Sequence, residues 1–600
     1  MSHSPAPTPR PPRPAAPRPR GAWPLLAAWW RSPESRTGRA LLALVIALDL
    51  ILVWRAALIT YWQKDFYDAL TRMDAAAFWP LLGTLALLAL GGLALNTSRT
   101  WFAQSIEIRW RDWLTQDFMR RWLADNAFWQ LEQGHHAPHV ENVDQRLAED
   151  LRLLAANTLG LGLGLGLLSN AVSLFTFSAI VWNISGALTL HLWGRDWSVP
   201  GYMLWIALAY ALIGSWLMEK IGGRMVRIDY EQQRAEADFR TALLRIRESA
   251  GQIALLGGGS AEQTRLAARF AAVRQNWAAV MTYTKRITLA DNAYTEIGAF
   301  VPYLLQGPRV LSGALTVGSL VQITQSFMRV RVALSWFVYK YKDLALLRSA
   351  LARLVEFDDA LRAQTRAGAD PAADPAPHIT RQIAHPADPH AADCTLHGVQ
   401  ALGPQGQPLT ALVNWRIRPG QRWLLHGPTG AGKSTLLRAT AGLWSHGQGH
   451  ITLPAAPARL YFAPQHSYLP PGASLRECLA YPASASAFDD TQYRAALHWA
   501  CLPALAPRLN EHADWARQLS PGQQQCLLFA RIWLHRPDWL FLDEATSALD
   551  EATEQTLHQR LLADLPGLTL ISIAHRSSLR PFHTHHLHLP PPGEQQVIHR

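Results

Sequence analysis

The chain has 600 residues, which is too long for a single hydrophobic core, and we expect it to form several domains. Nearly half of the residues are apolar (49%), only 17% are charged, and 25 are tryptophan. This mixture is typical of a membrane protein with a soluble part and argues against a wholly soluble enzyme. The formal net charge of +11 comes mainly from arginines spread along the chain. That distribution favours basic loops beside membrane helices over a nucleic-acid-binding surface.

The N-terminal half of the chain is predicted to contain membrane spans. Residues 1–24 are rich in proline and arginine and predict a disordered basic tail without the apolar core of a signal peptide. Residues 25–358 predict an all-α transmembrane domain with cytoplasmic extensions, because they hold apolar runs of the roughly 20 residues that a bilayer requires. Six spans are expected, at 40–62, 76–96, 159–183, 201–221, 290–310 and 315–338.

The distribution of charge predicts the orientation of these spans. Arginines cluster before the first span and in the two long connections at 97–158 and 222–289, whereas the opposite side carries few. The positive-inside rule therefore predicts that both termini are cytoplasmic, which agrees with an even number of spans. The two connections are charged and helix-periodic, so we expect membrane helices that continue into the cytosol and contact a motor domain there. Solvated helical hairpins without a mechanical role are the alternative.

Two acidic residues, Asp49 and Glu296, lie inside or at the edge of predicted spans. An acid in the bilayer is costly, so each is a candidate for proton or substrate binding. The alternative for Asp49 is a structural carboxylate compensated by Arg55, and the alternative for Glu296 is a position at the water interface.

The C-terminal part of the chain predicts a nucleotide-binding domain. Residues 359–392 predict a linker, and 393–600 alternate short apolar runs with helical segments, as in an α/β domain built on a mostly parallel sheet. Within this region, residues 423–435 combine an apolar run, a glycine-rich loop and the start of a helix.

Four residues of that stretch, Gly427, Gly432, Lys433 and Ser434, fill the phosphate-loop pattern. In this pattern backbone N–H groups hold phosphates, the lysine adds a positive charge, and the hydroxyl binds Mg²⁺. A glycine-rich turn without a ligand is the alternative, but it would not require all four positions. The chain is therefore predicted to bind a nucleoside triphosphate.

Further polar residues follow the predicted strands. Asp543 and Glu544 end an apolar run, and we predict that Asp543 holds Mg²⁺ and Glu544 polarises the attacking water. An acid pair that merely caps a turn is the alternative. Gln465 follows another apolar run and is expected to reach Mg²⁺ or that water, and His575 is expected to hydrogen-bond the terminal phosphate.

A second anion site is predicted at the start of a helix. Ser520 and Gly522 precede an apolar helical run at 526–534, and the N–H groups at such a helix N-terminus bind anions. Because the chain already has its own phosphate loop, this second site suggests that two domains enclose one nucleotide.

The C-terminal region resembles an ATP-binding cassette domain. Its motifs follow the order of that family: the phosphate loop, the Gln465 loop, the signature LSPGQ at 519–523, FLDE at 541–544, the loop Ser547-Ala-Leu-Asp550, and His575. The resemblance implies a type IV, exporter-like transporter with an α/β P-loop NTPase domain, in which Ser520 and Gly522 of one subunit close over ATP held by the other. The residues predicted to contact ATP are Gly427, Pro428, Thr429, Gly430, Ala431, Gly432, Lys433, Ser434, Thr435, Ser520, Gly522, Gln523 and Asp550. The predicted Mg²⁺ ligands are Ser434, Gln465 and Asp543, and the predicted catalytic residues are Glu544, His575 and Gln465.

A second resemblance covers the membrane half and continues into the ATP-binding cassette region. It rests on the segments 62–70, 109–115, 144–150, 236–240, 308–309, 441–444 and 474–482. These segments are similar to the SbmA/BacA-like, YddA-type family, which is related to the peroxisomal ABC subfamily D. The chain departs from the family pattern at Pro521 and Cys526, and at 402–404, where an aromatic residue would stack on adenine.

Together these features predict a homodimeric half-transporter of a bacterial inner (plasma) membrane that uses ATP to move a peptide-like, corrinoid-like or other hydrophilic or amphipathic solute. A proton-coupled uptake carrier with a regulatory cassette is one alternative. A soluble cassette ATPase acting on nucleic acid is another, and the apolar spans argue against it. The expected partners are a second copy of the chain, a lipid bilayer and a solute, and no nucleic acid.

Overall fold

A computed structural model describes residues 21–133, 140, 142–159, 162–192, 195–369, 378–386, 388, 390–403, 405–455 and 457–593. Residues 1–20 of the predicted tail lie outside this description. The chain forms two compact units, one comprising Met1–Arg121 and Glu141–Asp359 and the other Trp122–Val140 and Ala360–Arg600. We call them the helical unit and the sheet unit.

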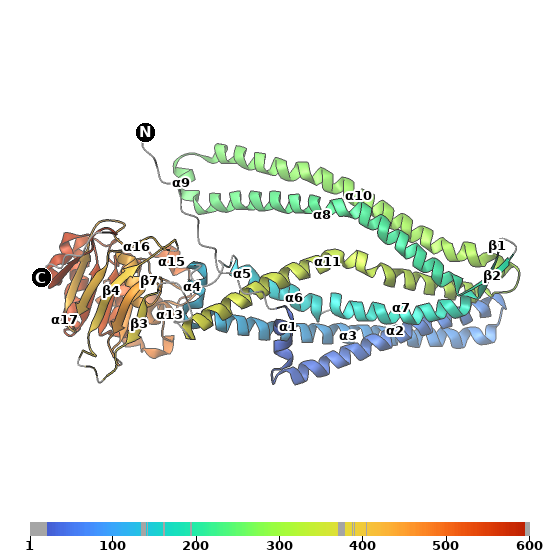
Figure 1. The fold of residues 1–600 in the computed structure, drawn as a ribbon, viewed down its shortest axis with the longest axis horizontal. Helices are drawn as coiled ribbons and strands as arrows, with labels where there is room; N and C mark the ends of the chain where they lie inside the picture. The colour runs from blue at the N-terminus through green and yellow to red at the C-terminus, as the bar shows by residue number, and fades with distance from the viewer. Residues whose placement is uncertain are drawn as a thin grey trace. The chain divides into compact units, whose positions relative to one another are not determined.

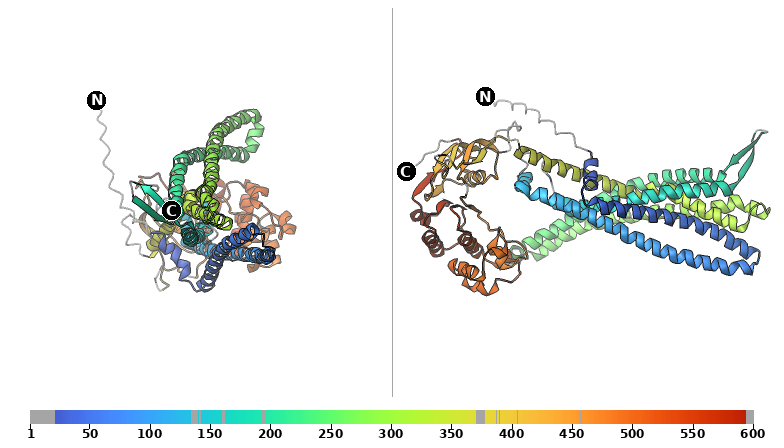
Figure 2. Two further views of the ribbon diagram at one scale, coloured as in Figure 1. Left: turned by 90° about the vertical axis from the view of Figure 1, so that its right-hand side faces the viewer. Right: turned by 90° about the horizontal axis from the view of Figure 1, so that it is seen from below.

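The helical unit consists mainly of long helices that run side by side (Figure 1). The hairpin β1–β2 joins α7 to α8, and α9 joins α8 to α10 at the other end of that helix pair (Figures 1 and 2). The elements are α1 (Trp23–Trp30), α2 (Ser35–Thr71), α3 (Ala75–Leu123), α5 (Val143–Gln145), the π-helical turn η2 (Arg146–Asp150), α6 (Leu151–Thr158), α7 (Leu163–Ser185), β1 (Ala187–Leu192), β2 (Arg195–Pro200), α8 (Tyr202–Glu248), α9 (Ala250–Leu255), α10 (Gly259–Leu311) and α11 (Val317–Ala369).

Among the described residues, four helical stretches are long and apolar enough to cross a membrane. They are Ser35–Thr71, Ala75–Gln133, Val143–Ser185 and Tyr202–Glu248, and they correspond to the first four predicted spans. The predicted fifth and sixth spans fall in the helices α10 and α11, which are not among these four. Charged residues such as Glu296, Arg329 and Arg331 make these two helices less apolar.

An apolar cluster holds α7, α8 and α11 together. Phe177 of α7 and Phe327 of α11 are both fully buried in it, and Met203 of α8 lies in the same cluster. Lipid is as apolar as these side chains, so between membrane helices such a cluster stabilises through close packing rather than through removal from water.

The acid Asp49 is compensated by a partner on another helix. Asp49 is 2% exposed, and its Oδ1 lies 2.5 Å from Nε of Arg99 on α3. Arg55, the partner considered from the sequence, instead donates through Nη1 to the Leu88 carbonyl oxygen at 3.0 Å. Arg55 is therefore not the counter-ion, because the packing of α2 on α3 brings Arg99 closer. Glu296 is exposed on α10.

Ion pairs also fasten the turn η2 to the C-terminal half of α11. Arg353 donates to the two carboxylate oxygens of Asp150 at 2.8 and 2.5 Å. Arg146 donates to the Arg353 carbonyl oxygen at 2.7 Å and to Glu356 at 2.9 Å. Asp150 is only 1% exposed, so its buried carboxylate depends on Arg353 for compensation.

The sheet unit contains a parallel sheet of five strands in the order β11-β6-β10-β9-β8 and a mixed sheet of four strands in the order β3-β7-β4-β5. All neighbours in the five-stranded sheet are parallel, whereas in the second sheet only β3 and β7 are. The strands are β3 (Thr380–Ile383), β4 (Cys394–Ala401), β5 (Val413–Ile417), β6 (Arg422–His426), β7 (Gly447–Leu453), β8 (Leu460–Ala463), β9 (Trp539–Asp543), β10 (Thr569–Ile573) and β11 (His585–His588).

Helices cover these sheets, and the buried apolar clusters lie between the layers. The helices are α4 (Ala127–Gln133), α12 (Lys433–Ala441), α13 (Leu475–Ala480), α14 (Asp490–Trp499), α15 (Trp515–Gln518), α16 (Pro521–His535) and α17 (Glu551–Asp564). Short 3₁₀ turns complete the unit: η1 (Ala124–Asn126), η4 (Ala485–Ala487), η5 (Pro503–Arg508) and η6 (Ser577–Phe582).

The segment 359–392, predicted as a linker, contains regular structure. Helix α11 continues to Ala369, and β3 pairs with β7 from Thr380 to Ile383. Arg381 of β3 donates to the Thr440 carbonyl oxygen at 3.0 Å. The partners of this strand lie much later in the chain, so its local composition gives no sign of them.

We expect Asp150→Asn to destabilise the helical unit. The amide keeps the size of the side chain but loses the charge that Arg353 neutralises, at a cost of about 1–3 kcal/mol. The thermal unfolding midpoint of the detergent-solubilised protein should fall by several degrees. Asp144→Asn makes the same change at an exposed site six residues earlier and should leave the midpoint in place. Equal midpoints for both variants would contradict this account.

Candidate functional site

The phosphate loop begins where the buried strand β6 ends and closes at the start of α12. Gly430 and Gly432 have φ values of +84° and +83°, a left-handed conformation that glycine adopts without steric cost. At Gly432 an added Cβ would lie 2.2 Å from the Leu409 carbonyl oxygen, whereas at Gly430 nothing lies within 4 Å. Glycine turns of this kind leading into a helix N-terminus form concavities lined by backbone N–H groups.

The side chain of Lys433 lies across this loop. Its Nζ donates to the carbonyl oxygens of Gly427 and Pro428 at 2.9 and 3.0 Å, and the residue is 7% exposed. Burial lowers the pKa of the Lys433 ammonium, and the nearby carboxylates of Glu544 and Asp543 oppose that shift. Lys433 is thus a buried cation whose hydrogen-bond acceptors are neutral carbonyl groups. At a turn of this kind, such a cation is suited to bind a phosphate.

The next residue, Ser434, meets the end of strand β9. Its hydroxyl donates to Oδ1 of Asp543 at 2.8 Å. Burial raises the pKa of the Asp543 carboxyl, and the hydrogen bond from Ser434 opposes that shift. Two of the three predicted Mg²⁺ ligands are therefore in contact. Among the described residues, no group of three or more histidine, cysteine, aspartate or glutamate side chains is placed to hold a metal ion.

The carboxylate of Glu544 connects two further predicted residues. Gln465 donates through Nε2 to Oε2 of Glu544 at 3.0 Å, and Nε2 of His575 lies 3.3 Å from Oε1. Glu544 has a φ of +49°, which is uncommon for a residue with a side chain and costs backbone energy. Its N–H donates to the Ile573 carbonyl oxygen at 3.0 Å, and this bond holds the residue beside the end of β10.

Sheet register explains why these residues meet. In the parallel sheet Ile573 of β10 pairs with both Leu425 of β6 and Asp543 of β9, and Ala463 of β8 pairs with Leu542. Parallel strands present their carboxyl ends at one edge of a sheet. The residues that follow β6, β8, β9 and β10 therefore converge at this edge.

The signature residues lie at a different helix. Ser520 is the N-cap of α16, where its Oγ accepts from the Gln523 N–H at 3.3 Å and Gln523 Oε1 accepts from the Ser520 N–H at 3.0 Å. Pro521 has no N–H, so the amide of Gly522 is the first backbone donor within α16. In the described part of the chain, no hydrogen bond or ion pair links these residues to the phosphate loop.

Asp550 likewise is the N-cap of a helix, α17. Its carboxylate accepts from the backbone N–H and the hydroxyl of Thr553 at 2.9 and 2.8 Å, and these hydrogen bonds lower its pKa. Two residues that we did not single out from the sequence hold this loop. Gln525 of α16 bonds to Ser547 and Ala548, and Arg576 donates to the Leu549 carbonyl oxygen at 2.7 Å. Their contacts depend on the fold, and no motif marks them.

Helix α4 contacts the far end of α12. The indole of Trp129 donates to the Leu443 carbonyl oxygen at 2.9 Å, and the guanidinium of Arg438 lies 5.8 Å from the centre of its ring. Residues 122–140 therefore belong to the sheet unit, although in the chain they follow directly from the membrane-length helix α3.

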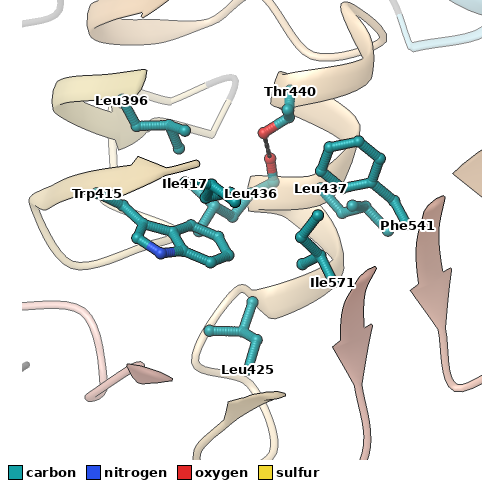
Figure 3. A pocket seen from close by; sticks show the side chains of 9 residues that line it. All are labelled: Leu396, Trp415, Ile417, Leu425, Leu436, Leu437, Thr440, Phe541 and Ile571. Carbon is teal, nitrogen blue, oxygen red and sulfur yellow. Dashed lines mark hydrogen bonds between the residues drawn. The ribbon is translucent and has the colours of Figure 1, made fainter. Parts of the chain in front are cut away.

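A small apolar cavity lies beneath α12, where Leu436, Leu437 and Thr440 face the strands (Figure 3). Its lining also includes Leu396, Trp415, Ile417, Leu425, Phe541 and Ile571. The cavity measures about 10 Å³, which is at the lower limit for one water molecule. It is part of the core and too small for a nucleotide or a solute.

The helical region, the α/β unit and its strand-edge site together define the class of this protein. Residues 30–311 match the family described as ABC transporter transmembrane region 2, and residues 411–547 match the family described as ABC transporter. The chain belongs to the ABC transporter family, and its sheet unit is an ATP-binding domain whose ATPase activity is coupled to transport.

Relatives match nearly the whole chain. The inner membrane ABC transporter ATP-binding protein YddA of Escherichia coli (strain K12) is 32% identical over 92% of this chain and 94% of its own length. The chloroplastic ABC transporter D family member 2 of Arabidopsis thaliana is 27% identical, over 92% of this chain and 84% of its own. The lysosomal cobalamin transporter ABCD4 of Homo sapiens is 25% identical, over 92% and 91%. The chain is thus related both to YddA and to the D family.

The two loop glycines allow a matched test of the phosphate loop. Gly430→Ala and Gly432→Ala impose nearly the same φ strain, about 1 kcal/mol, but only the second brings a Cβ against the Leu409 carbonyl oxygen. We expect Gly432→Ala to lower the thermal midpoint of the sheet unit clearly more than Gly430→Ala does. The measurement is made without nucleotide, so that contacts to phosphate do not contribute. A larger loss for Gly430→Ala would show that the loop has a different conformation.

Proposed function

We propose that this chain is a half-transporter that acts as a homodimer and uses the energy of ATP binding and hydrolysis, with Mg²⁺, to move a solute across a bacterial inner membrane. The observation that carries the proposal is the convergence of Ser434, Asp543, Gln465, Glu544 and His575 at one edge of the parallel sheet. In this proposal the phosphate loop 427–435 holds the phosphates of ATP, and Lys433 neutralises their charge.

The residues at this edge fit Mg²⁺ and the proposed chemistry. The hydroxyl of Ser434 and the carboxylate of Asp543 are hard oxygen donors of the kind that Mg²⁺ prefers, and the amide oxygen of Gln465 would complete the set. The ion would supply positive charge next to the phosphates. Glu544 accepts the proton of the attacking water, Gln465 positions that water, and His575 donates to the terminal phosphate.

The signature residues support a site shared between two chains. The N-terminus of α16, with Ser520, Gly522 and Gln523, is capped and ordered but has no bond to the phosphate loop among the described residues. In the proposed dimer it closes over the ATP held by the partner chain, together with Asp550. Closing and reopening of the two sheet units would then drive the helices of the membrane region.

For the membrane region we propose six spans per chain, with α10 and α11 providing the fifth and sixth and both termini in the cytoplasm. The relation to YddA, which carries inner membrane in its name, supports the location. The solute is a hydrophilic or amphipathic compound of the peptide-like or corrinoid-like class, in keeping with the SbmA/BacA-like resemblance and with the cobalamin transporter among the relatives.

A proton-coupled carrier with a regulatory cassette is not favoured. Asp49, one of the two acids considered for proton or substrate binding, is buried and forms an ion pair with Arg99, which gives it a structural role. The catalytic edge of the sheet unit would also have no direct part in transport under that alternative.

Glu544→Gln should bind ATP but lose turnover. The amide has the size of the carboxylate but does not accept a proton, so we expect the ATPase rate to fall by about 100-fold or more, while ATP affinity stays the same or rises. Glu551→Gln makes the same change at an exposed residue of α17 and should leave both quantities unchanged. An undiminished rate for Glu544→Gln would refute its role as the base.

Mixed dimers test whether ATP is held between two chains. Ser520→Asp keeps a good N-cap but places a negative charge where the phosphate of the partner's ATP would lie. In a shared arrangement, a dimer of one Lys433→Ala chain and one Ser520→Asp chain has one intact site. A dimer of one wild-type chain and one chain with both substitutions has none.

We therefore expect the first mixed dimer, purified through two different tags, to keep roughly half of the wild-type ATPase rate if the two sites act independently. The second mixed dimer should be inactive. The reverse order of activities would mean that each chain supplies both residues to its own site.

A further inference from the structure

Arg331 is a buried cation in the part of α11 that the proposed sixth span covers. It is 4% exposed, so only a small part of the side chain reaches the surface of the helical unit. It lies 14 residues after Val317, where α11 begins, which corresponds to about 21 Å along the helix axis. A hydrocarbon layer is about 30 Å thick, and a position well inside that layer leaves little scope for snorkelling to water.

Aromatic rings surround this cation on one side. The guanidinium lies 5.0 Å from the centre of the Tyr294 ring, and that ring stacks on Tyr210 of α8 at 4.7 Å with an interplanar angle of 11°. A Cβ at Gly298 would lie 3.0 Å from the Tyr210 ring and 3.3 Å from Cδ of Arg331. The absence of a side chain at Gly298 therefore lets α8, α10 and α11 close around Arg331.

The polar contacts of Arg331 are weak. Nη1 donates to the Thr295 hydroxyl at 3.5 Å, and Nε has no hydrogen-bond partner. Within the described part of the chain, Arg331 makes no ion pair. Asp291 lies one turn before Thr295 on α10, but it accepts its hydrogen bond from the Tyr339 hydroxyl at 2.6 Å. A cation–π contact compensates a desolvated guanidinium only in part.

Other buried charges in this protein are better compensated. In the helical unit the ion pairs that involve a buried residue include Asp49 with Arg99, Arg146 with Glu356, and Asp150 with Arg353. In the sheet unit Arg531, which is 3% exposed, donates to the carbonyl oxygens of Cys478 and Tyr468 at 2.5 and 2.8 Å. Arg331 has neither a carboxylate nor a pair of short bonds to carbonyl groups, so it keeps binding capacity for an acceptor that the chain does not itself supply.

We propose that Arg331, with Tyr294 and Thr295, binds the anionic group of the transported solute, a carboxylate or a phosphate. This inference rests on the proposed transport function and names the chemical class of its substrate. The guanidinium offers planar donors to the anion, the Tyr294 ring holds the cation in position, and the Thr295 hydroxyl adds a further donor. An anionic lipid headgroup shares this chemistry, and the experiment distinguishes it from the solute.

The test uses the full chain in nanodiscs of phosphatidylcholine, with two matched pairs of probes. One pair is a hexapeptide with a free C-terminal carboxylate and the same peptide as its C-terminal amide. The other pair is decanoate and decanamide. Thermal stabilisation and stimulation of the ATPase are measured against probe concentration. For the wild-type protein we expect the carboxylate of at least one pair to act at a concentration at least about tenfold lower than its neutral partner.

Variants then assign the effect to Arg331. Arg331→Gln should remove the preference for the carboxylate, and Arg331→Lys should keep part of it. Without a probe, Arg331→Gln should unfold at the same or a higher temperature than the wild type, because it removes an uncompensated charge. The control is Arg329→Gln, which changes an exposed arginine two residues away and should keep the full preference.

Several outcomes would overturn the inference. One is that the wild type shows no preference for the carboxylate in either pair of probes. Another is that the preference survives in Arg331→Gln, and a third is that Arg331→Gln without a probe is markedly less stable than the wild type. Stabilisation by added phosphatidylglycerol alone, dependent on Arg331, would assign the site to a lipid headgroup. Lys433→Ala should lose ATPase activity but keep the thermal effect of the carboxylate, so failure of the ATP-driven function is detected separately.

Discussion

The hydrogen bonds that join β6, β10, β9 and β8 in parallel register are the constraint on which the proposed ATP site depends. They bring the ends of four strands to one edge of the sheet. Polar side chains that follow different strands are in contact there. Ser434 bonds to Asp543, and Glu544 accepts from Gln465 and lies against His575. Glu544 also has a left-handed backbone conformation. The hydrogen bond from its N–H to the Ile573 carbonyl oxygen stabilises this strained conformation. The site is therefore preorganised by the fold, and the loops alone would not fix these distances.

The same geometry agrees with the proposal that this site is one half of a larger one shared by two chains. In the proposed mechanism the residues at the strand edge supply the phosphate loop, the oxygen donors for a cation and a general base. In the described part of the chain the N-terminus of α16 has no hydrogen bond to them. That N-terminus is already capped by Ser520 and Gln523, and Gln525 and Arg576 tie the loop at 547–550 to α16 and to the segment after His575. An ordered and unpartnered helix end is suited to meet an anion from outside the chain.

Motifs made of neighbouring residues could be read from the sequence, and contacts between distant residues could not. The phosphate loop at 427–435 is recognisable in the sequence because its spacing follows from one strand, one turn and one helix. The acids at 543–544 are recognisable because they end a single apolar strand. The sequence does not reveal that Asp49 pairs with Arg99, or that β3 exists, because each depends on a partner on another element. Nor does it show that Trp129 of α4 contacts the end of α12, since the connection 97–158 is predicted as one continuous helical pattern. The isolation of Arg331 is likewise a property of the packed helices and not of the span in which it lies.

Helix α12 links the phosphate loop to the chain that enters the membrane. Its first residues, Lys433 and Ser434, belong to the proposed ATP site, and just beyond its last turn the Leu443 carbonyl oxygen accepts from Trp129 of α4. Nine residues of α-helix span about 14 Å and keep their shape through their internal hydrogen bonds. In the proposed mechanism a displacement at Ser434 would be transmitted along this helix to the contact with Trp129. Residue Trp129 follows directly from α3, one of the membrane-length helices. The proposed path from the phosphate loop to that helix thus consists of one short helix, one hydrogen bond and covalent chain.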